Sequence, residues 1–297
     1  MEKIYIVCIC FQMKKNNKRI VILGSNSFIA KSLIKILIDK QINYIGINRK
    51  EVNFENKKSV QKLNKIIKPN DVIIFIAAIA PVKNITMLSK NLNICENIIN
   101  ILRLKKFDHL IYVSSDAVYS DSKSKITEKS LTIPDSLHGF MHLIREKMLL
   151  DLNCTKTFVR PTLIYGLDDP HNGYGPNKFI RLAQNNKKIS LFGNGEEKRD
   201  HINVENVAEI IFYSSKIKYN GIVNAVSGNV LSFNQIVKEI RNNYKNIKIK
   251  KIKRSGPMPH NGYRAFNNSK IKKKFPKLKL INLLSWIKKK YKYEKIN

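Results

Sequence analysis

The feature that most constrains the fold is segment 18–33, where a short apolar strand runs into an amphipathic helix through a single glycine. Residues 19–23 are rich in isoleucine and valine, as is typical of a buried parallel strand. From Phe28 onward apolar residues recur at helical spacing, and Gly24 stands between the two patterns. The first backbone N–H groups of such a helix lack partners and point toward one place. The turn therefore predicts a site for an anion such as a pyrophosphate, with Gly24 letting the backbone approach it.

Similar strand patterns recur along the first half of the chain and predict a parallel sheet. We expect strands over 44–48, 72–76 and 109–114, and helices over 60–67 and 88–102. In doubly wound sheets, ligands bind outside the carboxyl ends of the strands. Ala77 and Ala78 follow one of these ends, and the Ser-Ser-Asp-Ala-Val-Tyr run 114–119 follows another. A hydroxyl and a carboxylate at such an edge can hydrogen-bond a substrate oxygen.

The end of the second strand bears on the choice of a dinucleotide. An acidic side chain at this point binds the adenosine ribose hydroxyls of NAD, whereas an arginine accommodates the 2′-phosphate of NADP. The sequence has Asn48 and Arg49 here and no acid. We therefore predict NADP as the cofactor, with NAD as the alternative.

The formal net charge of +33 does not by itself indicate nucleic-acid binding. Only ten of the 55 basic residues are arginine, and the lysines are spread along the whole chain. We therefore expect the dense basic runs 248–254 and 288–295 to be solvated surfaces, and we predict no nucleic-acid partner. A positive surface still favours collection of an anionic substrate.

No apolar run approaches the roughly 20 residues needed to cross a bilayer, so we predict no membrane partner. The four cysteines, at positions 8, 10, 95 and 154, lack the spacing of a metal site or redox motif. These features predict a cytoplasmic protein with reduced thiols. Because the first strand begins near Arg19, we interpret residues 1–18 as an extension and Met13 as a candidate start.

An ordered series of motifs covers residues 19 to 275. Its members are Gly24 to Ala30, Ala77-Ala78, Asn91 with Asn97, Ser114 to Tyr119, Arg160 to Gly166, Arg199 to Ala208, Asn224 to Gly228 and Arg264 to Asn267. In this order they resemble an extended short-chain dehydrogenase/reductase of the NAD(P)-dependent nucleotide-sugar epimerase/dehydratase family. The resemblance implies an α/β fold: a Rossmann-type doubly wound parallel sheet with a smaller C-terminal substrate domain. Residues 19–165 and 200–227 would form the first domain, and 166–199 and 228–297 the second.

The same resemblance implies a set of site residues. Those expected to bind the cofactor are Gly24, Ser27, Phe28, Ile29, Ala30, Arg49, Ala77, Ala78, His142 and Pro161. Those expected at the catalytic centre are Ser115, Asp116, His138 and His142. Those expected to bind a nucleoside-diphosphate sugar are Ser115, Asn177, Arg199 and Arg264. A guanidinium can pair two phosphate oxygens at once, which makes Arg199 the strongest diphosphate candidate.

The chain departs from the family at its proton-transfer pair, which is usually Tyr-x-x-x-Lys. Here both positions are histidine, His138 and His142, and a spacing of four places them on one face of a helix. One hypothesis is that His138 replaces the tyrosine as acid and base, with an unperturbed pKa of about 6.5, while His142 hydrogen-bonds the ribose. The other is that proton transfer is lost and the protein binds a nucleotide without turnover. No third ligand stands nearby, so we predict no metal.

The residues leave epimerase, dehydratase and reductase open. Asp116 beside a catalytic hydroxyl resembles the dehydratases, whereas Arg49 and its preference for NADP suit an NADPH-dependent reductase. Family members pair through a helix bundle that includes the segment carrying His138, which implies a homodimer. The Phe-Gly-Asn-Gly segment 192–195 predicts a β-hairpin just before Arg199.

Overall fold

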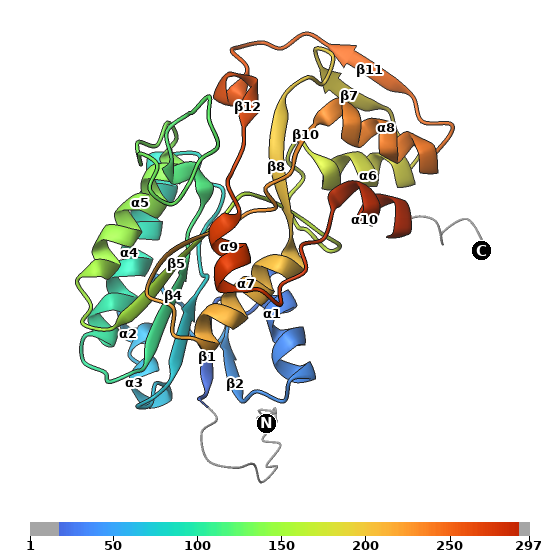
Figure 1. Ribbon diagram of the computed structural model, residues 1–297. Coiled ribbons are helices and arrows are strands. Elements are labelled where there is room, and N and C mark those ends of the chain that lie inside the picture. Colours follow the sequence, from blue (N-terminus) through green and yellow to red (C-terminus); the bar gives the residue numbers. More distant parts are fainter. Residues whose placement is uncertain (1–17, 291–297) are drawn as a thin grey trace, which may run out of the picture.

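The computed structural model describes residues 18–290, and a six-stranded parallel sheet lies at its centre (Figure 1). The strands, in spatial order, are β2 (Tyr44–Ile47), β1 (Ile20–Leu23), β3 (Val72–Phe75), β4 (His109–Val113), β5 (Thr155–Pro161) and β9 (Gly221–Ala225). The strand order reverses between β1 and β3, which is where a doubly wound sheet binds its ligand. The expected Rossmann-type fold is confirmed. The predictions for residues 1–17, including Met13, Cys8 and Cys10, lie outside the described residues, as does the end of the basic run 288–295.

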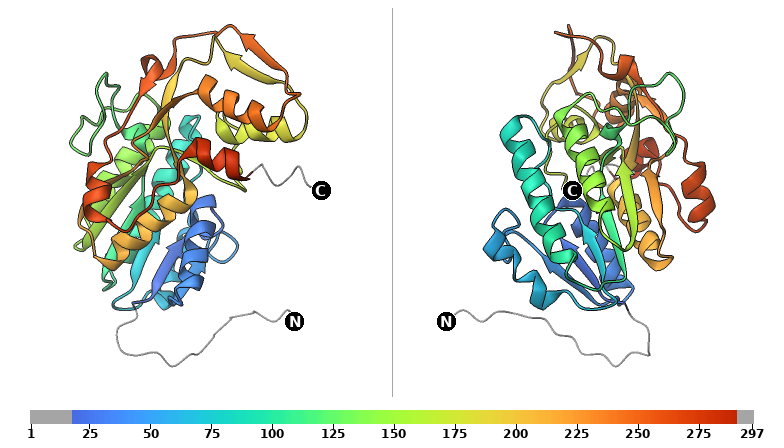
Figure 2. Two further views of the ribbon diagram at one scale, coloured as in Figure 1. Left: turned by 45° about the vertical axis from the view of Figure 1, so that its right-hand side comes forward. Right: turned by 90° about the vertical axis from the view of Figure 1, so that its left-hand side faces the viewer.

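Helices cover both faces of the sheet, as Figures 1 and 2 show. One face is covered by α1 (Phe28–Asp39), α7 (Val204–Lys216) and α9 (Ser269–Lys274). The other is covered by α2 (Lys57–Val60), α3 (Leu63–Ile66), α4 (Ile85–Leu102) and α5 (Leu137–Leu150). Ile20 and Ile22 face the first layer, and Val21 and Leu23 face the second. Burial on both faces explains why the strands are continuous apolar runs. No helix within residues 18–290 is long and apolar enough to cross a membrane.

A smaller unit lies beyond the carboxyl edge of this sheet. Its strands are β6 (Leu163–Tyr165), β7 (Ile189–Phe192), β8 (Lys198–Asn203), β10 (Val230–Ser232), β11 (Ile249–Ile252) and β12 (Tyr263–Arg264). Its helices are α6 (Pro176–Gln184), α8 (Phe233–Asn243) and α10 (Leu283–Lys290), with the 3₁₀ turn η2 (Pro259–Gly262). Side chains of β7, α6, α8 and α10 enclose a separate apolar core. The expected domain boundary at residue 200 falls inside β8, which pairs with β6, β10 and β12.

Two local predictions are wrong. The turn at 192–195 does not close a hairpin, because β7 pairs with β11 while β8 joins a different sheet. The carbonyl of Gly195 instead accepts a hydrogen bond from the backbone N–H of Asn234, at 2.9 Å, so the turn docks on the start of α8. The single helix expected over 60–67 is two short helices, and the side chain of Asn56 starts the first of them by accepting from the Ser59 N–H.

Candidate functional site

The turn after β1 has the geometry of a ligand-binding turn. Gly24 has a φ of +103°, and a Cβ at this position would lie 2.7 Å from the backbone nitrogen of Ala77. The turn therefore requires glycine both for its conformation and for the close approach of the next strand. Ser27, which stands where the family often has glycine, uses its hydroxyl to cap α1 by accepting from the Ala30 N–H at 3.2 Å. Ala30 is fully buried, which lets the helix pack closely on the sheet.

A cavity of about 290 Å³ lies beside this turn. Its lining includes Gly24, Ser27, Arg49, Ala77 and Ala78, all of which were predicted to bind a cofactor. Asn26, Asn48, Asn53, Phe54, Glu55, Ile76, Ile79 and Ile94 complete it. The other expected cofactor residues, Phe28, Ile29, Ala30, His142 and Pro161, do not line this cavity. A site next to an open helix N-terminus suits the pyrophosphate and adenosine part of a dinucleotide.

The cavity lining includes an acidic residue, Glu55, that the sequence analysis did not identify. The Arg49 guanidinium pairs with the Glu55 carboxylate at 2.8 Å, and the two side chains are 72% and 19% exposed. Glu55 follows the second strand by a loop rather than standing at its end, so the local motif did not identify it. The cavity therefore offers a carboxylate for ribose hydroxyls and an exposed cation for a phosphate.

Two buried side chains, the Asn91 amide and the Arg145 guanidinium, hydrogen-bond the backbone of the loop after β3. The Asn91 side chain bonds both the N–H and the carbonyl of Ile79, each at 2.9 Å. Arg145 of α5, which is 0% exposed, donates to the Ala77 carbonyl at 2.9 Å and to the Asn91 carbonyl at 3.0 Å. Asn91 therefore has a structural role, because it ties α4 to the lining of the cavity. Arg145 was not predicted, because its partners become neighbours only when α4, α5 and β3 pack together.

Ser115 and Asp116 follow β4, and Asp116 begins the 3₁₀ turn η1 (Asp116–Val118). Ser115 is 9% exposed, and its Oγ accepts from the Ala117 N–H, which leaves its own O–H available to donate. Helix α5 packs directly on this turn: a Cβ on Gly139 would lie 2.1 Å from the Ala117 carbonyl oxygen. Glycine at 139 therefore sets how near the start of α5, with His138, comes to Ser115 and Asp116.

The two histidines of α5 are brought together as expected. The rings of His138 and His142 meet edge to face, with centroids 4.7 Å apart. Burial lowers the pKa of His138 below its ordinary value of 6.5, and the nearby Asp116 carboxylate opposes this effect. Burial lowers the pKa of His142 further, and the charges of His138 and Arg145 act in the same direction. Both rings are therefore neutral at pH 7, and a neutral imidazole can accept a proton.

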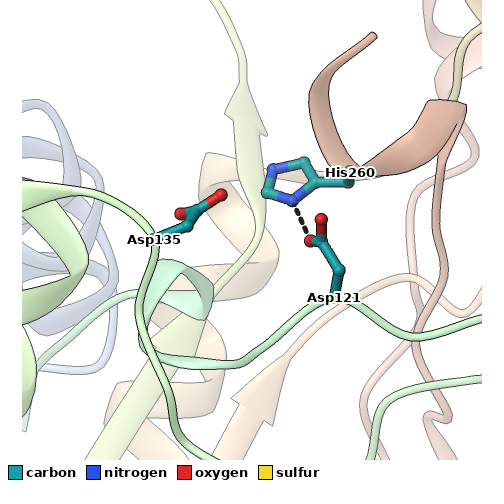
Figure 3. Close-up of side chains that lie close together, drawn as sticks. All are labelled: Asp121, Asp135 and His260. Carbon is teal, nitrogen blue, oxygen red and sulfur yellow. Dashed lines mark hydrogen bonds and ion pairs between the residues drawn. The ribbon is translucent and has the colours of Figure 1, made fainter. Parts of the chain in front are cut away.

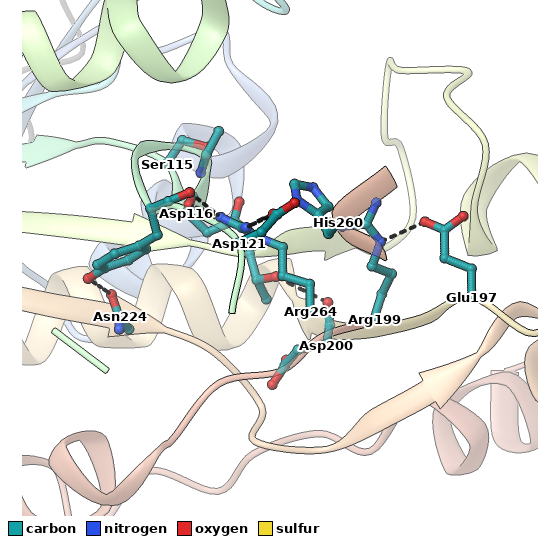
Figure 4. A network of polar contacts seen from close by, with 12 residues as sticks. Ser115, Asp116, Asp121, Glu197, Arg199, Asp200, Asn224, His260 and Arg264 are labelled. Carbon is teal, nitrogen blue, oxygen red and sulfur yellow. Dashed lines mark hydrogen bonds and ion pairs between the residues drawn. The ribbon is translucent and has the colours of Figure 1, made fainter. Parts of the chain in front are cut away.

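The Arg264 guanidinium holds Asp116 across the boundary between the two units (Figure 4). Its Nε donates to the Asp116 carboxylate at 2.9 Å, and Nη2 donates to the carbonyls of Asp116 and Tyr119. Its Nη1 lies 3.2 Å from both Asp121 and His260. All three guanidinium nitrogens thus contact protein groups, so a phosphate would have to compete with Asp116 and Asp121 for Arg264. Its role as a substrate contact stays a prediction.

Near this contact, the ligand atoms of Asp121, Asp135 and His260 lie within 4.8 Å of one another (Figure 3). Asp121 already contacts His260 and the Arg264 guanidinium. Positive charge is therefore present at the cluster, which opposes the binding of a metal cation. We assign this cluster to a structural contact in which Asp121, in the loop after β4, hydrogen-bonds His260 of η2 and pairs with Arg264 of β12.

Arg199 lies beside a second arginine that the sequence did not single out. The buried Glu197 carboxylate accepts from Arg199 Nε at 2.8 Å and from Arg254 Nη2 at 2.7 Å. Burial lowers the pKa of Arg199, and Arg264 acts in the same direction, although the group remains cationic. Figure 4 shows Arg199 and Arg264 on neighbouring parts of one polar network. The cluster concentrates guanidinium groups where the small unit meets the sheet edge, and guanidinium groups are well suited to binding anions.

Asn177, the remaining predicted substrate contact, holds the loop after β6. Its side chain donates to the Asp169 carboxylate at 2.7 Å, and its Oδ1 accepts from the Gly166 N–H at 3.2 Å. Arg181 bonds the carbonyls of Asp169 and His171 in the same loop. These contacts assign Asn177 a structural role in shaping the loop, while binding of substrate by it stays a prediction.

A family model agrees with this architecture. The model of the NAD dependent epimerase/dehydratase family matches residues 20–225, which is more than half of the chain. The chain belongs to this family. It is also similar to the dTDP-D-glucose 4,6-dehydratase of Dictyostelium discoideum, with 29% identity over 220 residues, or 58% of the chain. The match spans only about half, 47%, of the length of that relative.

Solved structures share the fold over nearly the whole chain. A UDP-glucose 4-epimerase of Thermus thermophilus, in complex with NAD, has a TM-score of 0.80 at 16% identity, covering 94% of this chain and 99% of that one. A GDP-L-fucose synthetase of Naegleria fowleri, bound to NADP, has a TM-score of 0.75 at 16% identity, covering 93% and 92%. At such identities the likeness concerns the fold alone. The expected family is confirmed, and the cofactor and reaction are questions for the site.

Proposed function

We propose that this protein is an NADP-dependent enzyme of the epimerase/dehydratase type that acts on a nucleoside-diphosphate sugar. The observation that carries the proposal is the packing of α5 on η1 through Gly139, which sets His138 beside Asp116 at the carboxyl edge of the sheet. A titratable group with a lowered pKa, held near a carboxylate at the ligand-binding edge of a doubly wound sheet, is typical of a catalytic centre.

His138 has the protonation state that the oxidative step needs. Its imidazole is neutral at pH 7 because burial lowers its pKa. It would accept the proton of a sugar hydroxyl while the same carbon loses hydride, and return that proton when the carbonyl is reduced. The Ser115 hydroxyl, whose O–H is not used within the described structure, would donate to the same sugar oxygen. A bound nicotinamide cofactor supplies the hydride acceptor.

The chain offers a fitting place for such a cofactor. Gly24 and Ser27, the N-cap of α1, line the cavity, so the first N–H groups of α1 lie at its edge. Arg49 would bind the 2′-phosphate of NADP on exchanging its contact with Glu55, while Glu55 itself would bind the ribose hydroxyls of NAD. We favour NADP because the guanidinium is 72% exposed and can move to a phosphate at little cost.

Substrate binding would depend on the arginine cluster. Glu197 orients Arg199 and Arg254, and a diphosphate that reached these groups would complete their charge balance. Return of the hydride to the opposite face of the same carbon would give epimerisation. Loss of water from the oxidised sugar, followed by return of the hydride to the unsaturated product, would give dehydration. Release of the oxidised or reduced sugar without return of the hydride would give a net dehydrogenase or reductase. Arg49 and NADP favour the reductase among these, whereas Asp116 favours the dehydratase.

We also propose a homodimer formed through α5. Phe140 and Ile144, one turn apart on this helix, are 44% and 37% exposed, and Ile85 on the neighbouring α4 is 65% exposed. Phe140 and Ile144, four residues apart, lie on one face of α5, and exposed apolar side chains on a helix face form the kind of surface that a second copy buries. Light scattering coupled to gel filtration tests this: a monomer mass at micromolar concentration would refute it.

Cofactor titration tests the proposal. Nucleotide-free protein is titrated with NADPH and NADH by fluorescence, and Arg49→Ala should weaken NADPH binding about tenfold while leaving NADH unchanged. Arg103→Ala is the matched control, because Arg103 also forms an exposed ion pair, with Asp151, away from the cavity. NADPH binding that is equal in all three proteins would contradict the assignment of Arg49.

Turnover then separates an enzyme from a nucleotide-binding protein. UDP-, dTDP- and GDP-sugars are incubated with the cofactor-loaded protein, and products are identified by mass spectrometry and NMR. His138→Gln keeps a polar side chain but cannot exchange a proton, so it should lower turnover by about 100-fold or more. If neither wild type nor variant converts any sugar while both bind cofactor, the non-catalytic alternative holds.

A further inference from the structure

A buried tyrosine lies directly behind the histidine pair. Tyr112 of β4 is 1% exposed, and its Oη is 2.8 Å from Nδ1 of His142. The two rings also pack against each other, with centroids 5.9 Å apart. This contact joins the central sheet to α5 at the position where the family usually has its lysine.

The direction of this hydrogen bond follows from the partners around the hydroxyl. Burial raises the pKa of Tyr112, so its hydroxyl keeps its proton. The Arg145 guanidinium, which also acts on this hydroxyl, has only donors. Within residues 18–290, Nδ1 of His142 is therefore the one acceptor that the Tyr112 O–H has. If the His142 Nδ1–H donated to Oη instead, this O–H would be buried without an acceptor, which is costly.

The tautomer of His142 follows from this direction. The Tyr112 O–H donates to the Nδ1 lone pair, so Nδ1 carries no proton. The ring proton of neutral His142 then resides on Nε2.

A buried cation keeps His142 from taking a second proton. Arg145, one turn later on α5, is 0% exposed, and the acceptors of its hydrogen bonds are neutral groups, chiefly carbonyls and the Asn91 amide. No carboxylate in the described part of the chain forms an ion pair with it. Its charge is thus uncompensated, and it disfavours an imidazolium at His142.

The other titratable groups around this contact do not supply a compensating charge. Cys95 of α4 has its pKa raised to about 11 by burial, so it is a neutral thiol. His138 lies on the same face of α5 and is neutral, because burial lowers its pKa. If His138 took up a proton, its charge would lower the pKa of His142 rather than favour protonation of that ring. Glu146, the nearest acid on α5, is already paired with Arg160, with 2.9 Å between its Oε1 and the arginine Nε.

We propose that Tyr112 is a positioning residue that fixes His142 as the neutral tautomer with its proton on Nε2, and that Arg145 prevents its further protonation. The two histidines then have different tasks. His142 is a fixed hydrogen-bond donor, because Nδ1 is occupied and no described protein group accepts from Nε2. His138 alone exchanges protons. This division of roles rests on the proposed function, in which the His142 N–H binds a ribose hydroxyl of the cofactor.

The tautomer can be measured without any substrate. Protein labelled with ¹⁵N-histidine gives two-bond ¹⁵N–¹H correlations that distinguish the Nε2–H and Nδ1–H forms, and His142→Gln assigns the His142 signals among the six histidines. We expect a pure Nε2–H pattern for His142 that does not titrate between about pH 5 and 8. A predominantly Nδ1–H pattern, or a titration near the ordinary pKa of about 6.5, would overturn the proposal.

Cofactor binding tests whether the tautomer matters. Tyr112→Phe removes only the hydroxyl, so the His142 signals should change to a mixture of tautomers and the dissociation constant for NADPH should rise about tenfold. Tyr165→Phe is the control, because it also loses one buried hydrogen bond, to the Ile281 carbonyl at 2.9 Å, without touching the histidines. Equal binding by the two variants would overturn the positioning role. If the wild type binds neither NADPH nor NADH, the proposed function fails, and the tautomer pattern alone decides the assignment of Tyr112.

Discussion

Replacing Gly139 with alanine tests whether the contact between α5 and η1 sets the catalytic geometry. The added Cβ would lie 2.1 Å from the Ala117 carbonyl oxygen and 2.8 Å from the Pro134 Cβ. Real Cβ atoms essentially never approach closer than 3.0 Å. The start of α5 and the turn 116–118 must therefore separate by about 1 Å, because neither neighbour is the end of a flexible side chain.

Two opposing terms determine the stability of Gly139→Ala. Alanine improves helix propensity by about 1 kcal/mol relative to glycine, whereas overpacking against backbone costs about 1–3 kcal/mol. We expect a net loss of about 0–2 kcal/mol, so the variant should remain folded. Displacement of His138 from Ser115 and Asp116 by about 1 Å should lower turnover far more, by about 100-fold.

Urea denaturation followed by circular dichroism measures the first effect, and the rate of sugar conversion measures the second. Gly256→Ala is the control, because a Cβ at that position meets nothing within 4 Å. A Gly139→Ala protein that gains about 1 kcal/mol and retains wild-type turnover would refute the reasoning. That result would mean that the contact relaxes without moving the histidine.

Two further predictions concern charge. Because His138 must be neutral to accept a proton and its pKa lies below 6.5, kcat/KM should fall as the pH drops through that lowered value. It should be level at about pH 7.5 to 8.5, more than one unit above the ordinary pKa of 6.5, and a rate that still climbs across this interval would argue against His138 as the base. Glu146→Gln should cost about 3–5 kcal/mol in urea denaturation, because it leaves Arg160 charged in a pair whose members are 3% and 4% exposed. Arg103→Ala, in a pair 52% and 61% exposed, should cost under about 1 kcal/mol, and equal losses would contradict this account.

The carboxyl edge of the sheet was predictable because its signals are local. A strand, a single glycine and an amphipathic helix follow one another in a short segment, and the structure confirms β1, Gly24 and α1 in that order. The ordered motifs likewise indicated the family and the Rossmann-type sheet. Backbone periodicity depends on neighbours in the sequence, so it can be interpreted without knowing the packing.

The partners of the site residues were decided by tertiary structure. Glu55 reaches Arg49 through a loop, and Arg264 reaches Asp116 from a position 148 residues away. The sequence gives no sign that Arg145 differs from the other charged residues of its helix. In the structure it is 0% exposed, because α4 and the loop after β3 pack around it. The predicted hairpin at 192–195 was wrong for the same reason: the turn contacts the start of α8, through a hydrogen bond from the Asn234 N–H to the Gly195 carbonyl, and β7 pairs with β11.

The sequence by itself thus determined the first four strands of the sheet, the glycine turn that follows β1 and the family that the chain resembles. Only the tertiary structure decided which charges pair, which histidine nitrogen is occupied and which arginines gather at the substrate side. The physical reason is the distance along the sequence between the groups that interact. Chain conformation follows from local sterics and hydrophobic spacing, whereas hydrogen-bond partners and pKa shifts depend on groups that only packing brings together.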